Sequence, residues 1–389
     1  MLRVVTAPTA PDPIDPAALG ARLEPLPGLD RIREAASGLR AYLVGGAVRD
    51  LLLGRDRADL DVVVEGDVEE LTARLGGEAI PHERFATAKV VLDGAEVDLA
   101  TARAETYSRP GALPDVRPAG LEEDLARRDF TINAMAVPLH GEPELIDPHR
   151  GRFDLEGRTI RILHDRSFVD DPTRALRAAR YAARFRFCVE DGTERPARDA
   201  DLSTVSEDRV EAELVRLAAE PSARRGFELL GSWGLVPLPD GAGPLIDAVV
   251  ELLGRPPWQG VADRALAVHA AATGRAPGAA GRLRDLRGAA RELAAASPGR
   301  PSEAVELARG HGDIELVLAR ADGAEWLDRY VDAWRHVSLE ITGDDLLREG
   351  VPEGPALGRG LDEAMRRKLD GEISGRDEEL RTALDAARG

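Results

Sequence analysis

The sequence predicts a small α+β domain followed by a long, all-helical remainder. Two observations indicate the first part: a strand–turn–helix–strand pattern over residues 41–64, and two apolar runs joined by Asp93-Gly94, a strong hairpin signal. The third observation is that from Pro172 onward the chain is rich in Ala, Leu, Arg and Glu at helical spacing. We therefore expect a mixed sheet with helices first, and helices alone afterwards.

The elements of the first part follow in a regular order. We expect strands at 41–44 and 60–64, a turn at Gly45-Gly46, a helix at 47–53, and hairpin strands at 89–92 and 95–100. This pattern ends near Pro148. Clusters of Gly and Pro near 237–244, 275–281 and 297–301 divide the helical part into several helices.

Length and composition limit the classes of protein that need to be considered. With 389 residues the chain predicts two or more domains. The proline-rich residues 1–16 predict a flexible lead-in without the apolar core of a signal peptide. No apolar run approaches the roughly 18 residues of a membrane span. The single cysteine, Cys188, excludes an intrachain disulfide and suits a reducing cytosol, so we expect a cytoplasmic protein without a membrane partner.

The net charge of −18 argues against a surface that is basic all over. Basic residues are almost all Arg, whose planar guanidinium suits phosphates and base edges. Any nucleic-acid site must therefore be a local cluster of arginines.

Two acidic pairs lie on predicted strands. Asp59 and Asp61 are two residues apart, so both side chains leave the same face. Two hard oxygen ligands at that spacing can share one or two Mg²⁺ ions, as phosphoryl-transfer sites require. Glu96 and Asp98 share a face for the same reason, and either could bind metal or accept a proton. In so acidic a chain, both pairs could also be solvated acids.

The turn at Gly45-Gly46 precedes a helix that carries Arg49 and Asp50. A glycine turn lets backbone N–H groups approach a triphosphate, and the helix N-terminus favours its charge. Arg49 could reach the same anion. The alternative is an ordinary strand–helix turn with an arginine on the surface.

Two further clusters combine arginines with short polar side chains. Residues 127–134, RRDFTINA, contain Arg127, Arg128, Asp129 and Asn133, types that suit phosphate and ribose contacts, although the segment could be only a helix start.

The other cluster starts at Asp170-Asp171-Pro172, where Asp171 is typical of an N-cap and Pro172 of a first helical turn. On that helix one side would hold Arg177, Arg180 and Arg184, and the core side Leu176, Ala179, Ala183 and Phe187. An arginine stripe is usually a solvated face, but such density in an acidic chain favours an anion site.

In order, GGAVRDLLLGRDRADLDVVVEGD, RRDFTINAMA and DDPTRALRAARYAARF resemble the class II CCA-adding enzymes and the similar bacterial poly(A) polymerases. The resemblance covers about residues 39–207, and a weaker one at 341–372 is to the family's tRNA-contacting tail. It implies an α+β nucleotidyltransferase head, a mixed sheet with helices, followed by an all-α neck, body and tail. The expected bounds are a flexible lead and short helix at 1–36, the head at 37–150, the nucleotide-reading neck at 151–235, the body at 236–335 and the tail at 336–389.

The resemblance assigns a role to each motif residue. Asp59 and Asp61 would hold two Mg²⁺ ions, and Asp98, five residues before Arg103, matches the third catalytic carboxylate, whereas Glu96 does not. The implied nucleotide-binding residues are Gly45, Gly46, Arg49 and Asp50 at the triphosphate, Arg128, Asp129 and Asn133 at the nucleotide and ribose, and Asp171 and Arg174 at the base, with Arg177 and Arg180 behind them. The family usually has Glu-Asp where this chain has Asp170-Asp171.

The implied reaction is template-independent addition of C, C and A to the 3′ end of tRNA from CTP and ATP. The RNA 3′-hydroxyl would attack the α-phosphate in line, and pyrophosphate would leave. The RNA stem would lie along arginine-bearing helices. Candidate contacts are Arg282, Arg284, Arg287, Arg291 and the helix N-termini around 354–358.

Several alternatives stay open. A partial enzyme would add only CC or only A, although the loop at about 104–120, with Arg109, Asp115 and Arg117, favours competence with ATP. A poly(A) polymerase shares every head motif, but such enzymes tend to carry basic extensions, and this chain ends in GRDEELRTALDAARG. A non-catalytic RNA-binding homologue is disfavoured because all three carboxylates are present. A metal-dependent phosphohydrolase domain would carry a His-Asp doublet with further His ligands. The sequence has one such doublet, His164-Asp165, and we expect no such domain.

Overall fold

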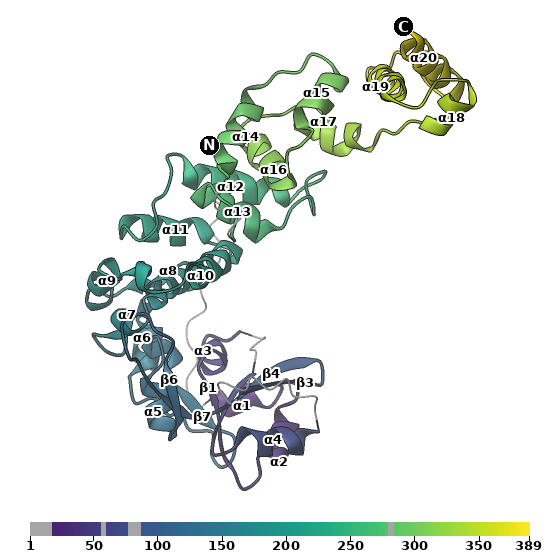
Figure 1. Ribbon diagram of the computed structural model, residues 1–389. Coiled ribbons are helices and arrows are strands. Elements are labelled where there is room, and N and C mark those ends of the chain that lie inside the picture. Colours follow the sequence, from purple (N-terminus) through teal and green to yellow (C-terminus); the bar gives the residue numbers. More distant parts are fainter. Residues whose placement is uncertain (1–17, 56–59, 77–86, 279–283) are drawn as a thin grey trace. The chain divides into compact units, whose positions relative to one another are not determined.

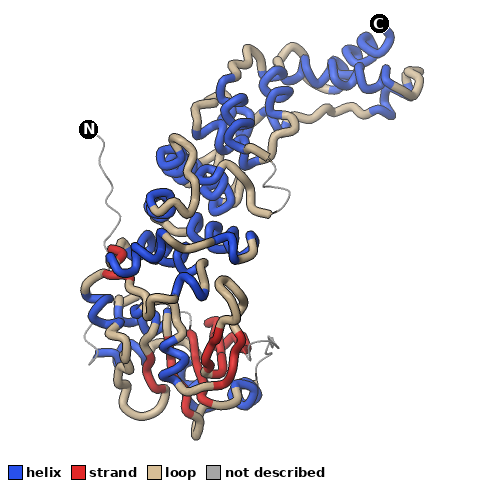
Figure 2. Tube along the Cα trace, turned by 60° about the vertical axis from the view of Figure 1, so that its left-hand side comes forward, coloured by secondary structure: helices blue, strands red, loops and turns tan. Residues whose placement is uncertain are grey.

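The computed structural model describes residues 18–55, 60–76, 87–278 and 284–389 (Figure 1). They form two compact units, which divide between Pro237 and Leu238. All described strands lie in the first unit, and the second is helical (Figure 2). The predicted fold class, a mixed α/β part followed by helices, is therefore confirmed. The finer division into lead, head, neck, body and tail stays a prediction.

A five-stranded mixed sheet forms the centre of the first unit, in the order β3-β4-β2-β1-β7. Its strands are β1 (Arg40–Val44), β2 (Leu60–Glu65), β3 (Thr87–Leu92), β4 (Ala95–Thr101) and β7 (Ala136–Pro138). Only the β2–β4 pair is parallel. The β3–β4 hairpin turns at Asp93 and Gly94, both with positive φ, as the favoured two-residue hairpin turn requires.

Helices cover both faces of the sheet. On one face α4 (Val68–Leu75) contacts β3, β4 and α2 (Leu29–Ala35), over buried side chains such as Leu99. On the other face, Val44 and Val63 pack with Leu121 and Leu125 of α5 (Leu121–Ala126). Because side chains alternate along a strand, Asp61 lies on the same face as Val63, beyond the end of this apolar cluster.

Short elements complete the first unit around the sheet. They are α1 (Leu19–Leu23), α3 (Gly46–Leu52), the antiparallel pair β5 (Arg103–Thr106) and β6 (Asp115–Pro118), η2 (Thr131–Asn133), α6 (Gly151–Glu156), α7 (Ser167–Asp170), and the parallel pair β8 (Thr159–Ile160) and β9 (Cys188–Val189). The two-residue strand β9 is a correction, because the sequence predicts helices alone after Pro172.

The helix α8 (Thr173–Phe185) packs against α10 (Glu207–Ala219) and α11 (Ala223–Ser232), with α9 (Asp191–Arg198) and η3 (Leu202–Thr204) between them in sequence. The predicted core positions Leu176, Ala179 and Ala183 are buried, but so are Ala175, Ala178 and Ala182. Small alanine side chains let neighbouring helices approach α8 from several sides, so its buried surface is wider than one face. Phe187 is buried too, but it lies beyond the end of α8.

The second unit is built from helices and a 3₁₀ turn. They are α12 (Ala242–Leu253), α13 (Arg264–Thr273), α14 (Leu286–Ala295), α15 (Pro301–Ala308), α16 (Asp313–Ala321), α17 (Leu327–Asp332), η5 (Trp334–His336), α18 (Gly343–Arg348), α19 (Pro355–Leu369) and α20 (Arg376–Arg388). The helices α18, α19 and α20 share a small core that includes Leu346, Ala364 and Ala383. No helix in the described ranges has the length and apolar character needed to cross a bilayer.

Candidate active site

A cavity of about 430 Å³ in the first unit brings the predicted motifs together. Its lining residues are Gly46, Arg49, Asp50, Asp61, Asp98, Arg127, Arg128, Asp129, Asn133, Asp171, Arg174, Arg177, Tyr181 and Arg184. Segments far apart in sequence thus meet at one site: the turn before α3, strands β2 and β4, the RRD segment and α8. Of the predicted site residues, Gly45 and Arg180 lie next to this lining, and Asp59 lies outside the described residues.

Asp61 and Asp98 stand side by side on the parallel strands β2 and β4, because Asp61 is in register with Asp98. The Asp98 side chain is 54% exposed, and Lys89 Nζ lies 3.8 Å from its Oδ1. Glu96 instead accepts a hydrogen bond of 2.9 Å from Lys89, which lowers the pKa of Glu96, and it does not line the cavity. Asp98 therefore lines the cavity and Glu96 does not, while the catalytic role of Asp98 stays a prediction.

The Asp61–Asp98 pair offers hard carboxylate oxygens, the ligand type that Mg²⁺ prefers. Within the described ranges no group of three or more acidic, His or Cys side chains is arranged to hold a metal ion. Asp59, which the resemblance implied as the metal-binding partner of Asp61, is not among those residues. The pair fits a divalent cation by its chemistry, and Asp61 also lies beside the glycine turn: its Oδ2 would be 3.4 Å from a Cβ at position 46.

The turn at Gly45 has a backbone conformation that side chains rarely adopt, with φ 63° and ψ −123°. A Cβ at this position would collide with Nη1 of Arg128 and would lie 3.6 Å from the carbonyl oxygen of Asn133. Glycine here therefore serves two purposes: it allows the turn into α3, and it leaves room for the Arg128 guanidinium beside that turn.

Replacing Gly45 by alanine is expected to lower kcat/KM for nucleotide transfer by about tenfold or more and to cost roughly 1–3 kcal/mol of stability, because it adds backbone strain and displaces Arg128. Steady-state kinetics and thermal denaturation measure the two effects. Gly38→Ala is the matched control, since φ is 80° there but no atom lies within 4 Å of the added Cβ. Equal losses of activity in both variants would show that strain alone, not the approach of Arg128, matters.

Arg49 and Asp50 form a buried pair at the start of α3. Nε and Nη2 of Arg49 each donate to Asp50, over 3.0 Å to Oδ1 and Oδ2, and Nη1 donates to Oδ1 of Asn133. Burial alone would lower the pKa of Arg49, but Asp50 outweighs it and the pKa is raised. Arg49 is only 4% exposed, so the alternative of a surface arginine is wrong. Asp50 orients the guanidinium that lines the cavity.

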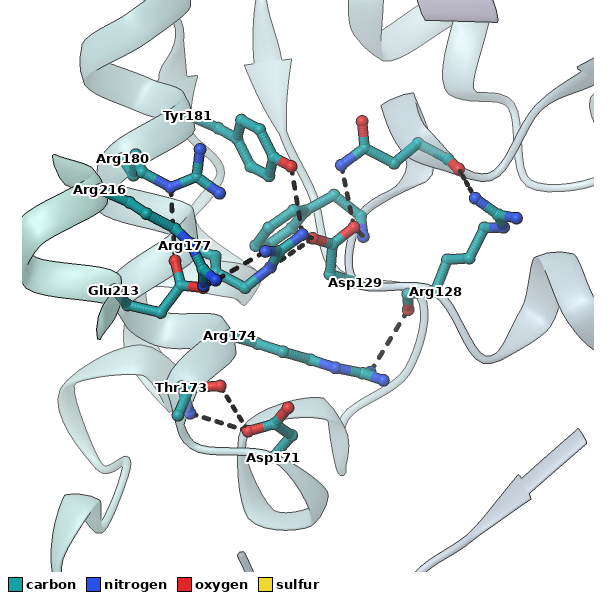
Figure 3. A network of polar contacts seen from close by, with 12 residues as sticks. Arg128, Asp129, Asp171, Thr173, Arg174, Arg177, Arg180, Tyr181, Glu213 and Arg216 are labelled. Atoms are coloured by element: carbon teal, nitrogen blue, oxygen red, sulfur yellow. Dashed lines mark hydrogen bonds and ion pairs between the residues drawn. The ribbon is translucent and has the colours of Figure 1, made fainter. Parts of the chain in front are cut away.

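Asp129 connects the RRD segment to α8 (Figure 3). Its Oδ1 accepts from the backbone N–H of Phe130 and from Nδ2 of Asn133, each over 2.9 Å. Its Oδ2 accepts from Nε and Nη2 of Arg177, over 2.8 and 2.6 Å. Burial would raise the pKa of Asp129, but Arg177 and Asn133 overcome this and lower it to about 2. Asp129 is thus ionised at neutral pH and fixes both Asn133 and Arg177.

Asp124, on α5, is a site residue that the sequence reasoning missed. Its side chain is 0% exposed and bridges two arginines, accepting from Arg127 through Oδ1 and from Arg128 through Oδ2. Burial would raise its pKa, but Arg128 and Arg127 hold the pKa below its usual value. The available signal was spacing: Asp124 precedes the two arginines by three and four positions, the separation at which helical side chains meet.

Glu213 of α10 is the second missed residue. It is buried between the arginines of α8: its Oε1 lies 3.5 Å from Nη1 of Arg177, and its Oε2 lies 3.4 Å from Nε of Arg180 (Figure 3). Arg180 also pairs with Glu220 over 3.4 Å. Arg180 therefore lies behind the cavity lining, where Glu213 and Glu220 hold it.

Asp171 and Arg174 lie at the start of α8. Asp171 accepts from the backbone N–H and hydroxyl of Thr173, the first residue of α8, although the N-cap position of this helix is Pro172 rather than the predicted Asp171. Asp171 also pairs with Arg209 over 2.9 Å. Arg174 donates to the carbonyl oxygens of Arg127 and Arg128, over 2.6 and 3.3 Å. The backbone of the RRD segment therefore holds the Arg174 guanidinium at the edge of the cavity (Figure 3).

The arginines expected to contact an RNA stem have different surroundings in the second unit. Arg287 is only 6% exposed and donates to the carbonyl oxygen of Asp240 over 2.7 Å, so it is not an exposed arginine on a helix face as the sequence predicted. Arg284 pairs with the buried Glu315 over 2.7 Å. Arg291 lines a hollow with Arg284, and Arg282 lies outside the described residues. The helix start predicted around 354–358 is that of α19.

Comparison with known proteins places this site in a family. Residues 41–161 match the poly A polymerase head domain. The chain is 37% identical to a CC-adding tRNA nucleotidyltransferase of Deinococcus radiodurans over 92% of both chains. It is 44% identical to an A-adding tRNA nucleotidyltransferase of Halalkalibacterium halodurans, over 52% of this chain and about half, 51%, of that relative's length.

A solved structure agrees with these relatives. The Thermotoga maritima CCA-adding enzyme complexed with tRNA-CCA superposes with a TM-score of 0.72 and 27% identity, over 95% of this chain and 97% of that one. The similarity to the Deinococcus radiodurans enzyme covers nearly the whole of both chains, and the head-domain match includes β1, β2 and β4. The chain therefore belongs to the class II tRNA nucleotidyltransferase family, whose members share the poly A polymerase head domain.

Proposed function

We propose that the protein adds C, C and A to the 3′ end of tRNA from CTP and ATP, without a nucleic-acid template. The observation that carries this proposal is the single cavity in which Asp61 and Asp98 face Arg49, Arg128 and Arg174. Carboxylates for a metal ion and guanidinium groups for phosphates are what nucleotidyl transfer needs at one place. We also propose a cytoplasmic location, where tRNA and nucleoside triphosphates are available.

The chemistry divides among the two kinds of side chain. Asp61, with Asp59 as its expected partner, would hold Mg²⁺, which when bound polarises the reacting phosphate. Asp98 is placed to accept the proton of the attacking 3′-hydroxyl or to complete the metal site. Arg49 and Arg128 lie beside the glycine turn and neutralise the charge of the triphosphate. Because Asp50 and Asp124 fix their guanidinium groups, little reorganisation is needed when the nucleotide binds.

Base choice is proposed to come from Asp171 and Arg174. Both side chains are held by protein contacts before a nucleotide arrives, and together they offer carboxylate acceptors and guanidinium donors to a base edge. A base of the wrong pattern would leave these half-buried and buried groups without partners, which costs more than the loss of one hydrogen bond.

Replacing Arg174 by alanine is expected to reduce discrimination between CTP or ATP and the other nucleotides by at least about tenfold, since one good polar contact to a base corresponds to roughly 1–3 kcal/mol. The measurement is kcat/KM for CTP, ATP, GTP and UTP on the same tRNA. Arg195→Ala, an exposed arginine of α9 outside the cavity lining, is the control. Equal losses for all four nucleotides would contradict a role in base reading.

A CC-adding enzyme is the second candidate, because the relative that matches over 92% of both chains is CC-adding. An enzyme that adds only A is the third, since the relative with 44% identity is A-adding. The loop between β5 and β6 favours addition of all three nucleotides in our proposal. The chain has this loop, and the hydroxyl of its Tyr107 lies 3.4 Å from Nη2 of Arg174, the proposed base-reading residue.

The experiment is nucleotide addition with Mg²⁺ on three tRNAs, ending at the discriminator base, at C and at CC. CTP and ATP are offered singly and together, and products are resolved at single-nucleotide length. Clean stopping after CCA on all three supports the proposal. Stopping after CC, or use of the CC-ended tRNA alone, would make this a partial enzyme, and long A tails on unrelated RNA would make it a poly(A) polymerase.

A further inference from the structure

Three guanidinium groups surround the buried ring of Phe185. The Cζ atoms of Arg49, Arg55 and Arg184 lie 4.7, 4.8 and 5.5 Å from the ring centroid. Phe185 itself is 1% exposed. An aromatic face attracts each cation, but the quadrupole of one ring is a weak counterweight to three full positive charges. Charges this close repel one another wherever water is partly excluded.

The three arginines differ in how their charge is balanced. Arg49 is neutralised by its two hydrogen bonds to Asp50. Neither Arg55 nor Arg184 forms an ion pair with a carboxylate in the part of the chain that the structure describes. Other arginines of the cavity are paired: Arg128 with Asp124, and Arg177 with Asp129. Arg55 and Arg184 thus form a locally unbalanced positive pair in a strongly acidic protein.

The environment of Arg55 agrees with this imbalance. Burial lowers the pKa of Arg55; the carboxylates of Asp50 and Glu220 oppose this effect, while the positive charges of Arg184 and Arg49 add to it. Asp50 and Glu220 are themselves paired with other arginines, Arg49 and Arg180. Arg55 remains fully charged at neutral pH. An anion between Arg55 and Arg184 would relieve their repulsion.

Position selects the kind of anion. Arg184 lines the same cavity as Gly46 and Asp61, whereas Arg55 lies outside that lining and adjoins it through the shared Phe185 ring. Arg184 lies ten residues after Arg174, or roughly 15 Å along the helix axis, so the two arginines are near opposite ends of α8. With a base at Arg174 and a reacting phosphate near Asp61, a further phosphate group would extend toward Arg184.

We propose that Arg55 and Arg184 form a phosphate-binding subsite at the end of the cavity distant from Arg174; this inference rests on the proposed function. The phosphate is either a terminal phosphate of the incoming nucleotide or a phosphodiester of the RNA end. Guanidinium groups recognise both through the same charge-assisted hydrogen bonds.

The test measures dissociation constants of CTP, CMP and a CC-ended tRNA for Arg55→Gln and Arg184→Gln. Loss of one charged contact predicts about a tenfold weaker complex. If the terminal phosphates of the nucleotide are the ligand, the constant for CTP rises and that for CMP does not. If an RNA phosphodiester is the ligand, the constant for tRNA rises and its logarithmic salt dependence becomes shallower by about one.

Controls separate this subsite from general damage. Arg195→Gln removes the same charge from the surface of α9, and Arg55→Lys and Arg184→Lys should keep most of the affinity. The proposal would be overturned if the Arg55→Gln and Arg184→Gln variants bound both CTP and tRNA with dissociation constants within twofold of those of Arg195→Gln. Equal losses for CTP and CMP would overturn it too, because they would indicate a disturbed cavity. Nucleotide addition by the wild-type protein is measured in a separate experiment. A wild-type protein without transfer activity would contradict the proposed function, whereas unchanged binding by the variants would contradict only the subsite.

Discussion

Asp61→Asn is expected to lower kcat/KM for nucleotide addition by at least about 10³-fold, which corresponds to roughly 4 kcal/mol of transition-state stabilisation. The substitution keeps the size of the side chain but removes the negative charge that would hold Mg²⁺ opposite Asp98. Asp61 is half-buried at the end of an apolar cluster, so the neutral amide should leave the fold intact. Steady-state kinetics over a range of CTP concentrations measure the first quantity, and a thermal denaturation curve checks the fold.

Two other carboxylates on β4 serve as matched comparisons. Asp98→Asn should lose a similar order of activity if it binds metal or accepts the proton of the 3′-hydroxyl. Glu96→Gln should keep activity within about twofold, because Glu96 pairs with Lys89 and does not line the cavity. Retained transfer by Asp61→Asn at saturating Mg²⁺ would remove Asp61 from the metal site. Raised Mg²⁺ should partly rescue the variant if weakened metal binding is the cause.

Much of the fold could be predicted because local signals and tertiary structure agree. The hairpin around Asp93-Gly94 has its own turn chemistry, and the strand before Gly45 ends where a positive φ is needed. Period-two spacing placed Asp61 and Asp98 on definite faces of their strands. Asp61 and Asp98 become neighbours only through the β2–β4 pairing, which joins residues 37 positions apart. The motif resemblance implied that these two carboxylates act together, whereas their spacing did not.

The supporting residues of the site were harder to predict because their role exists only after folding. Asp124 stands in an acidic helix start, LEED, where a carboxylate normally has solvent around it. Glu213 comes from α10 and becomes buried only because the alanines of α8 let that helix approach closely. The misplacement of Arg287 has the opposite origin: periodicity treats an arginine as exposed, but a buried guanidinium is acceptable where carbonyl oxygens such as that of Asp240 accept its hydrogen bonds.

Asp129→Ala is expected to destabilise the first unit by roughly 3–5 kcal/mol, because it leaves the Arg177 guanidinium and the Asn133 amide without their common partner. For a unit of this size the thermal midpoint should fall by about 10 °C. Transfer should fall as well, since Asn133 would no longer be fixed against Arg49. Asp201→Ala is the control, as Asp201 is exposed and bonds only to its own turn.

The Arg177→Ala and Asp129→Ala/Arg177→Ala variants test whether the pair itself accounts for this cost. When both charges are removed, no unpaired ion remains, so the double variant should be less destabilised than the sum of the single variants by at least about 1 kcal/mol. Additive effects would mean that Asp129 acts mainly through Asn133 and the Phe130 amide. In that case Asp129→Asn, which keeps an oxygen acceptor, would retain most of the stability.

Acid titration gives an independent readout of the same pair. The pKa of Asp129 is lowered to about 2 from an ordinary value of 3.8, so the folded state favours its ionised form. The resulting stabilisation, about 2 kcal/mol, is fully present above pH 4 and is lost as the pH falls from 4 toward 2. The stability difference between the wild type and Asp129→Asn should therefore shrink across that window. A difference that stays constant from pH 5 to pH 2.5 would show that hydrogen bonding, rather than the charge of Asp129, ties the RRD segment to α8.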